Sequence, residues 1–177
     1  PAPGTTSVTL MTYGGTLTGN AANLSLENAA SYRGTPVFDV AIPGQVRITG
    51  LNSQSLTWSG GTNLWNIETA ANWNSGTTTF SFGDAVTFTD AGTNKSVSMT
   101  ANLEPSSVTF NNSSGNDYTL SASPTTAGLT GTTGLTKSGT GTVTLGGTNS
   151  FSGNIAVNAG RLKMASQAAF GTSPGVT

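Results

Sequence analysis

The chemistry open to this chain is limited first by the side chains that it lacks. Its 177 residues include no histidine and no cysteine, which excludes Ser-His-Asp and Cys-His catalysis and the usual zinc, haem and iron–sulfur sites. Carboxylates remain the strongest catalytic candidates, because two positioned acids can cleave a glycosidic bond. The four that we considered, Asp84, Asp90, Glu104 and Asp117, are scattered over different predicted loops. We therefore expect no enzyme, and a polysaccharide-degrading enzyme is the least favoured alternative.

No cofactor or metal site is expected either. The sequence has neither the D-x-D-x-D-G pattern nor the G-G-x-G-x-D repeat of calcium sites. Lys137 follows Thr136 without a phosphate-binding G-x-x-x-x-G-K-[ST] frame. Six basic and seven acidic residues make up only 7% of the chain, so nucleic acid is not an expected partner. The apolar runs are too short for a transmembrane helix.

Three tryptophans give the strongest indication of ligand recognition. Exposed indole faces at Trp58, Trp65 and Trp73 could bind sugar rings by stacking. Thr57 and Ser59 flank Trp58 in an alternating segment, however, and this pattern favours an indole packed in the core. We expect burial, and we keep a carbohydrate-binding surface adhesin that uses these tryptophans as the alternative function.

Short alternating segments rich in β-branched and aromatic residues predict an all-β fold. Val97, Val108 and Tyr118 lie 11 and 10 residues apart, so a strand recurs about every ten residues. This spacing fits an antiparallel β-sandwich as well as a β-solenoid. The small residues between the segments suit tight corners and favour the solenoid.

In a solenoid, the inward side chains of successive coils stack in columns, and each buried aliphatic or aromatic side chain contributes about 1.5–3 kcal/mol. The residues that we expect in these columns are Val97, Met99, Val108, Phe110, Leu120, Val143, Leu145, Ile155, Val157, Leu162 and Met164.

One segment has a more specific pattern. From Gly139 to Leu162, small or apolar residues occupy nearly every alternate position, including Val143, Leu145 and Ile155. The segment resembles one copy of the autotransporter-associated β-strand repeat, also called the passenger-associated transport repeat. The upstream run from Leu56 through the three tryptophans resembles the opening found before such repeats in large bacterial surface proteins.

The resemblance implies a right-handed parallel β-helix in an exported passenger outside the cell, with no catalytic residues. We expect three parts: an N-terminal β segment over residues 1–55, a Trp-rich opening over 56–84, and solenoid rungs over 85–177 that include one full repeat at 139–162. The expected function is that of an extracellular structural unit, such as a stalk, adhesin scaffold or filament. Head-to-tail self-association through the chain ends is the expected partnership, with glycans or a neighbouring cell surface as other partners.

Overall fold

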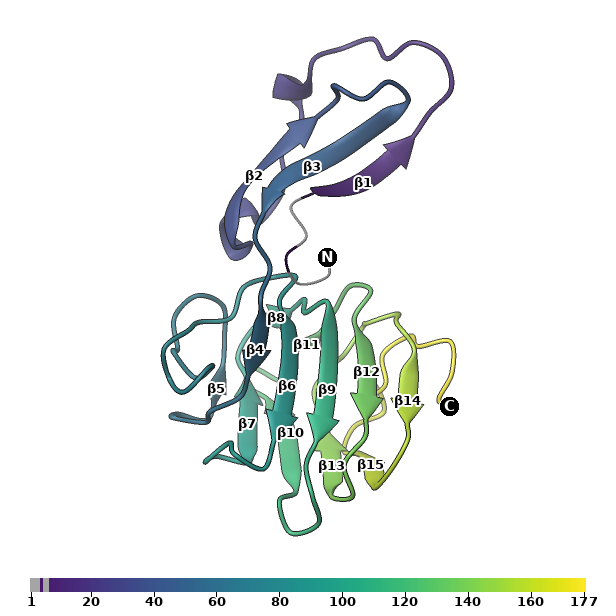
Figure 1. Ribbon diagram of the computed structural model, residues 1–177. Helices are drawn as coiled ribbons and strands as arrows, with labels where there is room; N and C mark the ends of the chain where they lie inside the picture. The colour runs from purple at the N-terminus through teal and green to yellow at the C-terminus, as the bar shows by residue number, and fades with distance from the viewer. Residues whose placement is uncertain (1–3, 5–6) are drawn as a thin grey trace.

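The computed structural model describes residue 4 and residues 7–177. Residues 1–3 and 5–6 of the predicted segment 1–55 lie outside the described residues. The described chain forms a small antiparallel sheet followed by a parallel β-solenoid (Figure 1).

The N-terminal sheet has three strands, β1 (Ser7–Thr12), β2 (Gly34–Asp39) and β3 (Gln45–Leu51), with β3 in the centre. Both pairings are antiparallel. Two 3-10 helices, η1 (Ala21–Asn23) and η2 (Ala29–Ser31), lie in the connection between β1 and β2. Val46 and Ile48 are the buried centre of this unit. The expected irregular N-terminal β segment is confirmed.

The solenoid has two five-stranded sheets and one two-stranded sheet. The first sheet contains β4 (Ser55–Thr57), β6 (Ala85–Thr89), β9 (Ser107–Asn111), β12 (Gly134–Lys137) and β14 (Ile155–Val157). The second sheet contains β5 (Leu64–Trp65), β7 (Ser96–Met99), β10 (Tyr118–Ala122), β13 (Thr142–Leu145) and β15 (Arg161–Met164). The third sheet contains β8 (Asn102–Leu103) and β11 (Gly128–Leu129).

The strand register stacks the coils directly on one another. Val86 pairs with Val108, Val108 with Leu135 and Leu135 with Ile155, all in parallel. Every inward position therefore lies above an inward position of the previous coil. The predicted parallel β-solenoid is confirmed over residues 85–164, and the antiparallel sandwich is excluded there.

Parallel pairing also reaches into the Trp-rich segment. Leu56 of β4 pairs with Val86, and Trp65 of β5 pairs with Met99. The two large sheets therefore begin upstream of residue 85, and the tryptophans lie within the coil that opens the solenoid.

Most of the expected column residues are buried. Val157 and Leu162 are only partly buried against the core, and the prediction for Met164 is wrong, since 52% of this residue is exposed. Met164 lies on β15, the edge strand of the second sheet, and no strand of the described residues pairs with its outer edge. The buried members of the set are Val97, Met99, Val108, Phe110, Leu120, Val143, Leu145 and Ile155.

Candidate functional site

Asp84 is a buried carboxylate that joins the N-terminal unit to the solenoid. It lies 2.9 Å from Arg33 Nη2 and accepts hydrogen bonds from the backbone N–H groups of Gln54 at 2.7 Å and Ser81 at 2.9 Å. Arg33, from the loop before β2, also donates to the carbonyl of Thr79 at 2.7 Å. Charge pairing and backbone donors satisfy this buried group, so its partners are structural.

Two of the other acidic candidates bind residues of a neighbouring coil. Asp90 accepts hydrogen bonds from Ser113 Oγ at 2.6 Å and Ser113 N at 2.7 Å, and these bonds lower the pKa of its carboxyl below the usual value. Asp117 accepts a bond from the N–H of Thr142 at 2.7 Å. Glu104 lies in the bend after β8. The four carboxylates thus lie on different loops, and Asp90 and Asp117 join successive coils.

Residue 4 and residues 7–177 contain no group of three or more histidine, cysteine, aspartate or glutamate side chains that could hold a metal ion. The same residues form no helix with the length and hydrophobicity of a membrane span.

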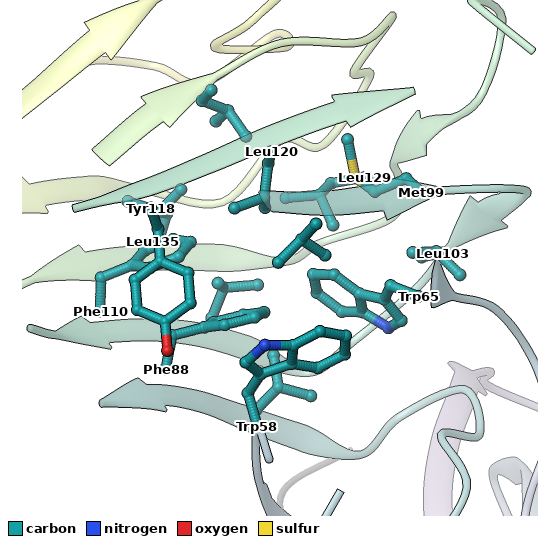
Figure 2. Packing of buried hydrophobic residues seen from close by; sticks show 14 of the residues in the cluster. Trp58, Trp65, Phe88, Met99, Leu103, Phe110, Tyr118, Leu120, Leu129 and Leu135 are labelled. Carbon is teal, nitrogen blue, oxygen red and sulfur yellow. The ribbon is translucent and has the colours of Figure 1, made fainter. Parts of the chain in front are cut away.

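All three tryptophans lie inside the core, each with 0% exposure. Figure 2 shows Trp58 and Trp65 beside Phe88, with ring centroids 5.6 and 5.5 Å from it. Trp58 also meets Trp73 edge to face at 5.0 Å, and its Nε1 donates to the Asn94 carbonyl at 2.8 Å. No indole face is free to stack on a sugar ring, so the glycan-binding alternative at these residues loses its physical basis.

Residues 66–84 close the N-terminal end of the core. Trp73 forms an antiparallel bridge to Trp58, and the next residue covers the free edge of β4. The N–H of Asn74 donates to the carbonyl of Thr57 at 2.8 Å, and Asn74 Oδ1 accepts from the N–H of Thr57 at 2.9 Å. An edge occupied in this way is protected from pairing with another strand.

At the C-terminal end, the described residues cover the last strand of the first sheet but not that of the second sheet. β15 is the last strand of the second sheet, and its Met164 side chain faces solvent. On the first sheet, Val176 bridges to Ile155 of β14 in parallel and is 53% exposed. The backbone of Thr177 forms hydrogen bonds with Ile155 and Val157, so it occupies the edge of β14. This end therefore presents a strand edge together with apolar side chains that continue the inward columns.

Lys137 is a core residue that our sequence reasoning missed. It is fully buried and lies in register between Phe110 of β9 and Val157 of β14. Its Nζ donates to the carbonyl of Gly139. Burial lowers the pKa of its ammonium group, and the charge of Asp117 opposes this effect. The alternation after Leu135 would have placed it inward, but lysine is almost never fully buried.

Tyr118 of β10 makes a second buried polar contact, at the corner between β6 and β7. Its hydroxyl donates to the Thr89 carbonyl at 2.6 Å, and Lys95 Nζ lies 4.8 Å from its ring centroid. Burial, with a smaller contribution from Asp90, raises the pKa of the Tyr118 hydroxyl. Desolvation lowers the pKa of Lys95. These contacts hold the Tyr118 ring and the Lys95 ammonium group at one corner of the coil.

Comparison with known proteins identifies one family. The family model described as passenger-associated-transport-repeat matches residues 135–164, which run from β12 to β15 and include the whole segment from Gly139 to Leu162. The resemblance inferred from the sequence is confirmed. Neither the curated proteins nor the solved structures contain a match to the chain.

Proposed function

Because this chain carries a passenger-associated transport repeat in β12 to β15, we propose that it is a non-enzymatic structural element of a secreted or surface-exposed passenger protein. The repeat implies export, and the stacked coils suit a stalk or an adhesin scaffold. Its work is then mechanical: to hold other parts of a passenger away from the cell surface.

The observation that carries this proposal is the unbroken stacking of inward side chains from Leu56 to Ile155. Each inner coil pairs its backbone with the coils on both sides, so few of its main-chain groups are left for a protease to bind. Without a single cysteine, resistance must come from this pairing and from packing.

Limited proteolysis tests the proposal. A protease of broad specificity is needed, because lysine and arginine together number only six. We expect early cuts in the exposed connection between β1 and β2 and a long-lived fragment that contains residues 55–177. Rapid cleavage inside the coils between β6 and β13 would contradict a protective, rigid role.

We also propose that the chain self-associates. The difference between its two ends favours a contact at the C-terminal end. The expected head-to-tail contact requires a free edge at each end, but Asn74 occupies the edge of β4. The edge of β15, with Met164, is the better site for strand addition by a second copy.

Sedimentation velocity over a concentration series tests this contact. The unmodified chain should show a growing fraction of dimer, and Met164→Lys should reduce it. Met11→Lys serves as the control, because Met11 is 50% exposed on the distant N-terminal sheet. A species that stays monomeric at all concentrations would exclude self-association while leaving the structural role intact.

A further inference from the structure

The outer face of the first sheet carries a row of threonines in strict register. Thr57 pairs with Thr87, Thr87 with Thr109 and Thr109 with Thr136. Side chains on neighbouring parallel strands stand about 4.8 Å apart. The row therefore repeats one methyl and one hydroxyl group at a fixed interval across four strands.

The hydroxyls of this row are available to a ligand. Within the described part of the chain, none of the four threonine side chains forms a hydrogen bond to another protein group, although nearby hydroxyls such as Thr93 Oγ1 do. Thr57 is exposed and the other three are partly exposed. No other segment passes in front of β4, β6, β9, β12 and β14 in Figure 1.

The face is also uncharged and free of aromatic rings. The outward residues beside the row are small, and they include Ser55, Ala85, Ser107 and Ala156. The second sheet differs, because β15 ends its outer face with Arg161 and Lys163 in register with Thr142 and Thr144. A surface without rings has no platform for stacking sugars, and one without charge has no attraction for phosphate or acidic partners.

From these features we propose that the outer face of the first sheet binds the surface of ice. The oxygen repeat in the ice lattice is close to the spacing between neighbouring strands, so successive threonines can meet successive lattice positions. Threonine is suited to this contact because each hydroxyl both donates and accepts, while the methyl group fits between lattice waters. Its stiff χ1 torsion on a paired strand keeps the array ordered before binding.

Partition into slowly growing ice tests the proposal with the whole chain. A dilute solution is frozen onto a cold surface, and the protein in the ice is compared with that in the remaining liquid. We expect enrichment in the ice for the unmodified chain. Thr109→Lys, at the centre of the row, should lose most of this enrichment, and Thr136→Lys on the next strand should behave alike.

Thr144→Lys is the matched control, since Thr144 is an outward threonine on a central parallel strand of the second sheet. This variant should still enter the ice, and all variants should keep the unfolding midpoint of the unmodified chain. Exclusion of the unmodified chain from ice, or equal enrichment of Thr109→Lys, would overturn the proposal. So would exclusion from ice combined with retention on crystalline chitin. The passenger role is unaffected by any of these results.

Discussion

The rings of Phe88 and Phe110 stack almost parallel, with centroids 4.8 Å apart and planes inclined by 17°. The two residues are direct partners in the register of β6 and β9. Their contact shows how one coil supports the next: the same inward position is filled by the same ring, one strand spacing away. Trp58, Trp65 and Trp73 extend this aromatic packing to the N-terminal end.

Phe110→Ala should destabilise the fold strongly. The substitution removes a fully buried ring between two coils, and truncations of this kind cost about 3–5 kcal/mol. Urea unfolding followed by circular dichroism measures the change. Thr119→Ala, on the exposed face of β10, should alter the free energy of unfolding by no more than about 0.5 kcal/mol. Equal effects of the two substitutions would show that the inward column does not carry the stability.

Tryptophan fluorescence should report three buried indoles. With no exposure at Trp58, Trp65 or Trp73, we expect emission at short wavelength and weak quenching by acrylamide. Adding soluble oligosaccharides should leave the spectrum unchanged. A shift that depends on sugar concentration would instead revive recognition by these residues, provided that it disappears in a tryptophan-to-alanine variant.

Much of the solenoid follows from alternation in the sequence. In β6, β9 and β13, apolar residues at every second position can be buried only on one face, and this correctly placed Val108, Phe110, Val143 and Leu145 in the core. Small residues at the corners then favoured coils over a sandwich. Local patterns of this kind suffice where each coil repeats the geometry of the previous one.

The parts that sequence reasoning missed depend on position in the stack. Met164 has the same alternation as Leu145, but it lies on the edge strand and stays exposed. The contact of Trp73 with Trp58 arises when residues 66–84 fold back over the core, which no local period encodes. Lys137 is inward because its register with Phe110 outweighs the preference of a charge for water.

Arg33→Ala should cost far more stability than Arg47→Ala. The first change leaves the buried Asp84 carboxylate without its cation, and an unpaired buried charge costs about 3–5 kcal/mol. Arg47 pairs with Asp39 at 3.6 Å near the surface, where such pairs contribute about 0–1 kcal/mol. Urea unfolding of both variants gives the comparison. Similar losses would argue that Asp84 is stabilised by its backbone donors alone.

Lys137→Met should stabilise the protein at neutral pH and lose this advantage in alkali. Because burial lowers the pKa of Lys137 in the folded state from its ordinary value of 10.5, the unfolded chain holds the proton more tightly. Stability of the unmodified chain therefore rises as pH increases from the folded-state pKa toward 10.5, and the cost of the buried charge disappears.

The measurement is the difference in unfolding free energy between Lys137→Met and the unmodified chain, taken at a series of pH values from neutral up to 10.5. Lys95, Tyr32 and Tyr118 also have shifted pKa values, but they titrate in both proteins, so their contributions largely cancel. We expect the difference to shrink as pH rises. A difference that is constant or grows would contradict a depressed pKa at Lys137.

The central claim, that the coils stack in parallel register, is tested most directly by a distance between spin labels. The chain has no native cysteine, so Thr57→Cys and Thr136→Cys provide two unique attachment sites on the outer face of the first sheet. Three strand steps separate them, which predicts a backbone separation of about 14 Å. A narrow distribution consistent with this separation supports the stack, and a broad or much longer one contradicts it.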